Sequence, residues 1–331
     1  MYTEYERLSS IEKTYYQTML RIASTGNAYF EFTHAADTDS IGRAFDAMLV
    51  DNPQFFWLSG GGQFVTTTRG NTVIKVTFKG NLSEGICAAD VPRLLAELER
   101  AVDAIVAKAR TKRTVYEQVL FVHDYLVDTT DYVTQEPMRY NAYGCLVRHR
   151  AVCAGYAKAF MMIMRKLGYV CGYASGYGVN SNVSHAWNFI RLDGEFYFID
   201  VTWDDPVTAG KTTHGGNKTR EYFCLTSEEL SRTHRVSGKY PVPRCTGTKY
   251  NYYTYNGFVL SRYSFAEVSR IAQKQLRTSN RFTVKFTTSA EADRAKQELI
   301  LAKKVFQIPG VSRQVRHAVS DSGRILTVYN T

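Results

Sequence analysis

Apolar residues recur three or four positions apart between residues 4 and 127, which is the spacing of one buried helix face. The stretches with this period are predicted to be helices: residues 4–24, a segment from Asp39 or Ser40 to the stop at Asp51-Asn-Pro53, residues 90–109 and residues 114–127. Short or alternating apolar runs between them are predicted to be strands: residues 28–32, 55–58, 63–68 and 72–78, with turns at 60–62 and 69–71. Residues 1–110 are therefore expected to form a small α+β module.

The central part of the chain changes from a helical to an alternating pattern. A helix is predicted from Cys153 to Leu167, followed by a strand over residues 169–177. Two alternating apolar runs come next, residues 185–192 and 195–203, and the Asp193-Gly194 dipeptide between them is typical of a tight hairpin turn. The remaining elements expected here are a loop over 207–220, a strand over 221–225 and a short helix over 227–230. Two prolines, Pro241 and Pro243, then mark a boundary, so residues 111–240 are predicted to be the core domain.

The last part, residues 241–331, is predicted to be a separate α+β domain. Its expected elements are a strand over 252–260, a helix over 265–276, a strand over 281–286, a helix over 290–304 and a closing hairpin of 315–319 with 324–329. Thr288 and Glu291 have the spacing of a capping box at the start of the second helix. The hairpin is expected to turn at residues 320–323.

The composition is that of a soluble globular protein, with 44% hydrophobic and 22% charged residues in a chain of 331. No apolar run is long enough to span a membrane. The first residues lack the basic and apolar regions of a signal peptide, so the chain as given is expected in the cytoplasm, and outside the cell if a leader was removed. Six scattered cysteines with no two-residue spacing favour reduced thiols over a zinc knuckle or a disulfide framework.

The net charge of +10 is concentrated at the C-terminal end. From Tyr240 onward there are fifteen Lys and Arg against five Asp and Glu. Such a basic domain could bind nucleic acid, an anionic cell-wall polymer or an acidic protein. Its charges alternate with apolar positions and no nucleic-acid motif accompanies them, which disfavours nucleic acid and leaves a solvated basic surface as the plainest interpretation.

Cys153 is the first candidate for chemistry. A cysteine in the first turn of a helix faces unpaired backbone N–H groups and the positive end of the helix dipole, and both stabilise a thiolate. The ordinary interpretation of a cysteine in an apolar helix is packing. The other cysteines, at 87, 145, 171, 224 and 245, lack this setting and are expected to be structural.

The predicted hairpin supplies a possible base for Cys153. If Asp193-Gly194 is a two-residue turn, then Leu192 faces Glu195, and the register places His185 and Asp200 diagonally on one face. The Asp200 carboxylate could then orient the His185 imidazole. Together with Cys153, these residues are predicted to form a Cys-His-Asp triad.

In that triad the backbone N–H of Cys153 would be one oxyanion donor. Asn141 and Tyr143, just upstream, are candidates for a second donor or for substrate contact. Each triad member also has a structural interpretation, since a histidine at a strand start is usually structural and an aspartate often caps a turn. His123, within the predicted helix 114–127, is expected to be a core or surface histidine.

Four segments together resemble the transglutaminase-like superfamily, in its bacterial transglutaminase/protease-like branch. They are Tyr140-Asn-Ala-Tyr-Gly-Cys-Leu146, Ala151-Val-Cys-Ala-Gly-Tyr-Ala-Lys-Ala-Phe160, Ser184-His-Ala-Trp-Asn188 and Tyr197-Phe-Ile-Asp-Val-Thr-Trp-Asp-Asp-Pro206. The resemblance implies an α+β, papain-like core in which a helix bearing the cysteine packs on an antiparallel sheet bearing the histidine and aspartate. It also implies Cys153, His185 and Asp200 as the triad.

The same resemblance suggests supporting residues around the site: Tyr143, Trp187, Asn188, Trp203 and Asp204. The chain departs from the family pattern at Ala154, where an acidic residue is common, and little effect is expected because that side chain is outside the triad. No calcium-binding features of animal transglutaminases and no paired CxxC zinc motifs of peptide N-glycanases are recognisable. No metal or cofactor is therefore expected.

The leading functional hypothesis is thiol-dependent acyl transfer on peptide or side-chain amides through an acyl-thioester. Hydrolysis by a cysteine protease or amidase is preferred, because the sequence carries no evident device for an amine acceptor. The alternatives are a protein-crosslinking transglutaminase and a catalytically silent binding or scaffold protein of the same fold. Nucleic-acid binding by the basic tail is the weakest of the alternatives.

Overall fold

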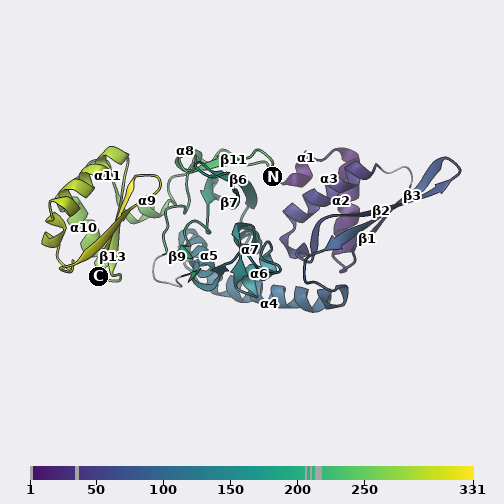
Figure 1. Ribbon diagram of the computed structural model, residues 1–331, viewed down its shortest axis with the longest axis horizontal. Helices are drawn as coiled ribbons and strands as arrows, with labels where there is room; N and C mark the ends of the chain where they lie inside the picture. The colour runs from purple at the N-terminus through teal and green to yellow at the C-terminus, as the bar shows by residue number, and fades with distance from the viewer. Residues whose placement is uncertain (1–2, 34–36, 206, 209–210, 213–217) are drawn as a thin grey trace.

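The structure is a computed structural model that describes residues 3–33, 37–205, 207–208, 211–212 and 218–331. It is elongated, with an N-terminal module at one end, a mixed helical and β core in the middle and a C-terminal α+β domain at the other end (Figure 1). The mixed α+β class expected from the sequence is therefore observed.

The N-terminal module packs three helices on a three-stranded antiparallel sheet. The helices are α1 (Glu4–Arg7), α2 (Ser10–Ala23) and α3 (Thr38–Asp51), and the sheet has the order β1 (Tyr29–Thr33), β3 (Thr72–Leu82), β2 (Leu58–Arg69). The single helix predicted over 4–24 is interrupted at Ser9, whose hydroxyl accepts from the Glu12 N–H while the Glu12 carboxylate accepts from the Ser9 N–H. This capping box starts a new helix and so explains the break.

Two predictions in this module were wrong. Residues 55–58 are not a separate strand, because Pro53–Phe55 form a 3-10 helix and β2 begins only at Leu58. Residues 60–62 are not a turn but lie inside β2, where the pairing with β3 is irregular between Leu58 and Gly62. A Cβ on Gly62 would lie 2.3 Å from the Phe78 ring. The glycine therefore permits close packing of the two strands.

The core domain combines a helical layer with an antiparallel sheet. Its helices are α4 (Val91–Arg110), preceded by a 3-10 turn at Ala88–Asp90, α5 (Val115–Thr129), α6 (Ala142–Leu146), α7 (Cys153–Lys166) and α8 (Ser227–Leu230). The sheet has the order β11 (His234–Val236), β6 (Cys171–Gly178), β7 (Ser184–Leu192), β8 (Glu195–Ile199). Two short pairs accompany it: β4 (Asp131–Tyr132) with β5 (Arg150–Ala151), and β9 (Val207–Thr208) with β10 (Lys211–Thr212).

The predicted hairpin register is confirmed over the paired residues, from Leu192 opposite Glu195 to Asn188 opposite Ile199. Both turn residues, Asp193 and Gly194, have positive φ, as a tight hairpin turn requires. The second strand is shorter than predicted, because β8 ends at Ile199 and turns follow it.

Two other core segments differ from expectation. The strand predicted over 221–225 is wrong, since only one isolated bridge, Phe198 with Leu225, is formed there. Part of the loop predicted over 207–220 lies outside the described residues.

The C-terminal domain has a four-stranded sheet of order β12 (Val259–Leu260), β13 (Arg281–Phe286), β15 (Ile325–Asn330), β14 (Val315–Val319). Its helices are α9 (Tyr252–Asn256), α10 (Phe265–Leu276) and α11 (Ser289–Lys296), with a π turn at Gln297–Leu301 and a 3-10 turn at Lys304–Gln307. The strand predicted over 252–260 was largely wrong, because Asn251 accepts the N–H groups of Tyr253 and Thr254 and so starts a helix. Gly257, with φ of 72°, ends it.

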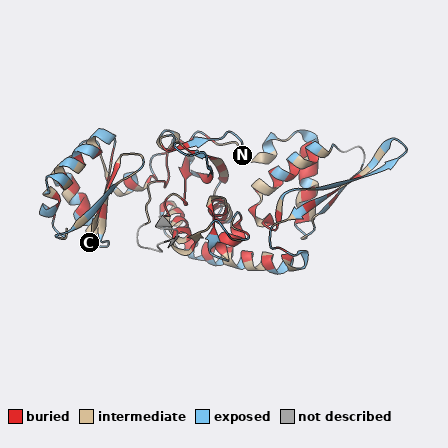
Figure 2. Cartoon of the chain, in the orientation of Figure 1, coloured by how far each residue is buried: buried red, intermediate tan, exposed pale blue. Residues whose placement is uncertain are grey.

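The buried side chains show how these parts are joined. One continuous apolar cluster runs from the N-terminal helices through α4, α5, α6 and α7 to one face of the core sheet (Figure 2). The C-terminal domain has its own cluster between α10, α11 and its sheet, and a third small cluster surrounds Trp187. The N-terminal module is thus packed onto the core, whereas the C-terminal domain has an independent interior. Within the described residues, no helix has the length and apolar character needed to cross a membrane.

Candidate active site

Cys153 is the first residue of α7, immediately after the extended residue Val152. The first turn of this helix packs closely on the segment before it. A Cβ on Gly155 would lie 2.6 Å from the Arg139 carbonyl oxygen and 2.8 Å from the Ala151 Cβ, so only glycine fits there. This contact sets the position of the helix start. Cys153 is partly buried, in contrast to the exposed Cys87 and the four fully buried cysteines.

His185 and Asp200 meet as the hairpin register predicted. The distance from His185 Nε2 to Asp200 Oδ2 is 2.5 Å, and the two residues are 8% and 1% exposed. Cys153 is close enough to this imidazole to contribute to raising the pKa of His185. The imidazole is therefore flanked by a thiol and a carboxylate.

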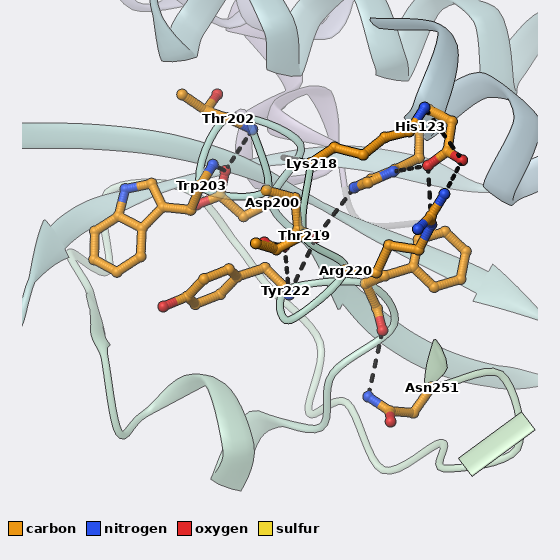
Figure 3. Close-up of polar contacts among 12 residues, drawn as sticks. His123, Asp200, Thr202, Trp203, Lys218, Thr219, Arg220, Tyr222 and Asn251 are labelled. Atoms are coloured by element: carbon orange, nitrogen blue, oxygen red, sulfur yellow. Dashed lines mark hydrogen bonds and ion pairs between the residues drawn. The ribbon is translucent and has the colours of Figure 1, made fainter. Parts of the chain in front are cut away.

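Asp200 is held by several donors. Its Oδ1 accepts the backbone N–H groups of Thr202 at 3.0 Å and Trp203 at 3.2 Å, which closes the turn after β8 (Figure 3). Burial by itself raises the pKa of Asp200, but the charges and hydrogen bonds of His185 and His234 outweigh it and hold the pKa well below its usual range. Asp200 is thus ionised at neutral pH.

The same ion pair shifts the pKa of His185 in the opposite direction. Burial by itself lowers the pKa of His185, but the negative charge of Asp200, its hydrogen bond and the neighbouring Cys153 raise the pKa to about 10. A protonated His185 is therefore favoured at neutral pH, next to a carboxylate on one side and a thiol on the other.

A second histidine, His234 on β11, also binds Asp200, and the sequence pattern did not indicate it. The distance from His234 Nε2 to Asp200 Oδ2 is 3.0 Å, and Nδ1 lies 2.8 Å from the Thr233 hydroxyl. No local spacing marks this histidine, because β11 reaches the site only by pairing with β6.

The side chains of His185, Asp200 and His234 could also be considered as metal ligands, because their donor atoms all lie within 4.8 Å of one another. Donor atoms on one tetrahedral zinc ion would be about 3.3 Å apart. The observed contacts of 2.5 Å and 3.0 Å are hydrogen-bond distances, so we interpret the group as hydrogen bonded rather than as a metal site.

Two of the predicted supporting residues pack against this group, and a third, Asn188, connects the elements that carry it. The Trp187 and Trp203 rings lie 5.7 Å and 5.4 Å from the His185 ring, and Trp203 is 4.1 Å from the His234 ring. The Asn188 side-chain amide donates to the carbonyl oxygens of Ala157 at 2.9 Å and Gly172 at 3.0 Å. Asn188 thus ties α7 to β6, which keeps the cysteine helix in place against the histidine strand.

Asp204 belongs to a buried network with His123 and Thr219, both of which are labelled in Figure 3. Its Oδ2 lies 3.1 Å from His123 Nε2, and its Oδ1 accepts the Thr219 hydroxyl at 2.6 Å. His123 Nδ1 lies 3.0 Å from Asp124, which in turn pairs with Arg220 through two nitrogens. His123 and Asp204 are both fully buried.

The charges of this network explain why His123 is protonated. Burial by itself lowers the pKa of His123, but hydrogen bonds and charges from Asp124 and Asp204 raise the pKa to about 8. His123 is therefore a structural cation in the core. The sequence-based expectation of a core histidine agrees with its place in the structure.

We expect the replacement Asp204→Ala to lower the free energy of unfolding by about 3–5 kcal/mol, because it removes one of the two carboxylates that pair with the buried His123 charge. The surface replacement Asp293→Ala, which removes an exposed carboxylate, should change it by less than about 0.5 kcal/mol. Urea unfolding of both variants measures the difference. Equal stabilities would contradict a structural role for the network.

The two upstream residues proposed near the oxyanion have other partners. Tyr143 is buried in α6, its hydroxyl lies 2.5 Å from Glu97 on α4, and its ring stacks on Phe56. The Asn141 side chain accepts the Gly144 N–H at 3.0 Å and so caps α6. Both side chains therefore connect α6 to its neighbours, and the structure does not bring them to the triad.

A cavity of about 320 Å³ opens beside His185. Tyr132, Trp203 and Tyr222 form aromatic walls, and Asp321 reaches it from the turn of the C-terminal hairpin. The Ser322 hydroxyl donates to Glu221 at 2.7 Å, which anchors this turn to the core. The C-terminal domain thus contributes to the surroundings of the site.

Residues 101–201 match the Transglutaminase-like superfamily. Kyphoscoliosis peptidase from Mus musculus and that from Homo sapiens are each 31% identical over 88 residues, which cover 24% of this chain. The match spans only 13% of the length of these relatives.

Two solved structures are also similar. One is a TGase, with a TM-score of 0.32 and 12% identity over 59% of this chain and 55% of that chain. The other is a candidate cysteine protease from Cytophaga hutchinsonii, with a TM-score of 0.29 and 14% identity over 43% of this chain and 62% of that chain. At such scores the likeness carries no functional information. The matched region, by contrast, includes Cys153, His185 and Asp200, so residues 101–201 are the part of this chain that is similar to the transglutaminase-like superfamily.

Proposed function

We propose that this protein is a thiol-dependent acyl-transfer enzyme that hydrolyses peptide or side-chain amide bonds with Cys153, His185 and Asp200 as its triad. The observation that carries the proposal is the buried His185 imidazole, which is hydrogen bonded to the Asp200 carboxylate and lies close enough to Cys153 for that side chain to raise the pKa of the histidine. A thiol next to an imidazole held by a carboxylate is the arrangement that generates a nucleophile at neutral pH.

In the proposed reaction, the proton of the Cys153 thiol already resides on His185, as the raised pKa of this imidazole favours, and the thiolate sulfur attacks the carbonyl carbon of the amide. The carbonyl oxygen becomes an oxyanion, which the Cys153 backbone N–H at the start of α7 can stabilise. The C–N bond then breaks as His185 returns the proton to the leaving amine. Water, activated by the same imidazole, hydrolyses the remaining acyl-thioester and releases the acid.

Asp200 would orient His185 throughout this cycle, because Nε2 is bound to the carboxylate and Nδ1 is thereby directed to the thiol. His234 would hold the same carboxylate oxygen from the opposite side. The two backbone N–H groups on Oδ1 complete the arrangement, so every member that acts on the substrate is positioned by a neighbour.

The test uses the full chain, N,N-dimethylcasein as acyl donor and monodansylcadaverine as a fluorescent amine. We expect cleaved peptides, or glutamine converted to glutamate, in mass spectra, with little fluorescence in the protein bands. Dominant incorporation of the amine would instead make the protein a transglutaminase. If neither product forms, and a Cys153→Ala variant behaves like the native chain, the enzymatic proposal fails and a binding role is favoured.

The pH dependence of activity provides a separate prediction. The raised pKa of His185 keeps its imidazolium, the acid for the leaving amine, available until the pH approaches about 10. We therefore expect the alkaline limb of kcat/KM near pH 10, far above the ordinary histidine value of about 6.5. In Asp200→Asn, the loss of the negative charge should move this limb toward neutral pH. An alkaline limb near pH 6.5–7 in the native chain would contradict the proposed ion pair.

A further inference from the structure

Lys158 lies on α7, five residues after Cys153, and lines a second cavity. This cavity has a volume of about 310 Å³ and lies between the N-terminal module and the core domain. Phe55, Phe56 and Leu58 from the module and Met138 from the core form much of its wall. It is separate from the cavity beside His185, since the two share no lining residue.

The Lys158 amine has no hydrogen-bond or ion-pair partner among the described residues, and it is only partly exposed. Burial lowers the pKa of Lys158 to about 8, and no nearby negative charge offsets this effect. Water still reaches the half-buried ammonium group, and a negative charge beside it would favour its charged form. The described chain does not supply one.

The polar neighbours in the cavity wall are already engaged. The Asn52 side-chain amide donates to the Tyr16 hydroxyl and the Met48 carbonyl, both at 2.8 Å. The Asn141 side chain caps α6. Glu84, the acidic residue among the described lining residues, is 76% exposed at its side chain and lies 3.8 Å from Arg139. A ligand is therefore the remaining source of negative charge for Lys158.

We propose that this cavity binds the C-terminal residue of a peptide, with its carboxylate on Lys158 and an apolar side chain against Phe55, Phe56 and Leu58. The carboxylate complements the unpaired ammonium, and the apolar wall complements the side chain. The lining residues Ser59 and Ser83 donate their hydroxyl protons to the carbonyl oxygens of Leu82 and Phe56, and each hydroxyl oxygen can still accept an N–H group of a peptide, which favours a peptide over a plain fatty acid. The alternative is a lysine that is merely solvated in an unused cavity.

Isothermal titration calorimetry on the full chain tests the site with two probes of the same shape. N-acetyl-phenylalanine carries the carboxylate, and N-acetyl-phenylalaninamide lacks the charge. We expect the acid to bind at least about tenfold more tightly than the amide at pH 7, the difference that a charge-assisted hydrogen bond provides. At pH 8 the acid should also take up protons on binding, because the carboxylate raises the pKa of Lys158. The binding enthalpy should then vary with the ionisation enthalpy of the buffer.

The matched variants are Lys158→Met and Lys166→Met. Both remove a lysine from α7, but Lys166 lies outside the cavity and pairs with Asp103 at 2.5 Å. Lys158→Met should remove the preference for the acid, and Lys166→Met should keep it. Equal binding of acid and amide to the native chain, no binding of either, or an unchanged preference in a folded Lys158→Met variant would each overturn the proposal. These measurements detect no turnover, so their outcome is separate from that of the catalytic proposal.

Discussion

Replacing Cys153 by alanine is expected to lower kcat/KM for amide hydrolysis by at least about a thousandfold, because the proposed acyl-thioester cannot form without the sulfur. The loss should appear in kcat rather than in KM, since the cysteine binds little of the substrate before attack. The change in kcat/KM is measured by steady-state kinetics. The substrate is the peptide on which the dimethylcasein experiment detects hydrolysis. A variant that keeps more than about a tenth of the native rate would exclude Cys153 as the nucleophile.

Cys87 offers a matched control for this replacement. It is the fully exposed thiol among the six, whereas Cys153 is partly buried next to an imidazole. Cys87→Ala should leave activity unchanged. Iodoacetamide at neutral pH should modify Cys153 faster than Cys87 in spite of its lower exposure, because His185 accepts the thiol proton. Faster modification of Cys87 would show that the imidazole does not activate Cys153.

The second large effect is expected for Asp200→Asn. The amide replaces a buried carboxylate oxygen that now accepts two imidazole N–H groups, so His185 loses the partner that directs Nδ1 to Cys153. A loss of about 10³–10⁴ in kcat is expected from comparable triads. The measurement is single-turnover acylation at several pH values. A loss below about tenfold would show that the carboxylate does not orient the histidine in this chain.

His234→Phe separates the two histidines that bind Asp200. Phenylalanine keeps a ring packed beside Trp203, yet it donates no hydrogen bond to Asp200. Because His185, Thr202 and Trp203 still hold the carboxylate, we expect a loss of about tenfold, well below that of Asp200→Asn. A shift of the alkaline limb of kcat/KM should accompany it, which a purely structural replacement would not cause. A native rate and an unchanged pH profile in this variant would limit His234 to packing.

The local features of the site could be predicted from the sequence because they depend on short-range rules. The start of a helix at Cys153 follows from an apolar period after a polar loop, and the hairpin follows from Asp193-Gly194. A two-residue turn sets the register of both strands, and with it the diagonal approach of His185 and Asp200. This approach was predicted even though β8 stops one residue before Asp200.

The errors occurred where local patterns compete. Residues 252–256 are rich in tyrosine and read as a strand, yet the Asn251 cap and Gly257 make them a helix. The glycines at 60–62 read as a turn, yet they allow β2 to approach β3 closely. In the first case the side-chain cap of Asn251, and in the second the close approach of Gly62 to Phe78, outweighed the intrinsic preference of the residues.

The sequence alone determined which type of chemistry we propose for this protein, since the helix start, the hairpin turn and the alternation of the strands are each encoded within a short stretch of residues. Only the tertiary structure decided what surrounds that chemistry. His234 reaches Asp200 across 34 residues and Asp204 reaches His123 across 81, through sheet pairing and helix packing that no local period encodes. The cavity at Lys158 likewise exists only because the N-terminal module packs on the core. A buried charge needs a partner because its removal from water is costly. Which distant residue becomes that partner depends on the whole fold.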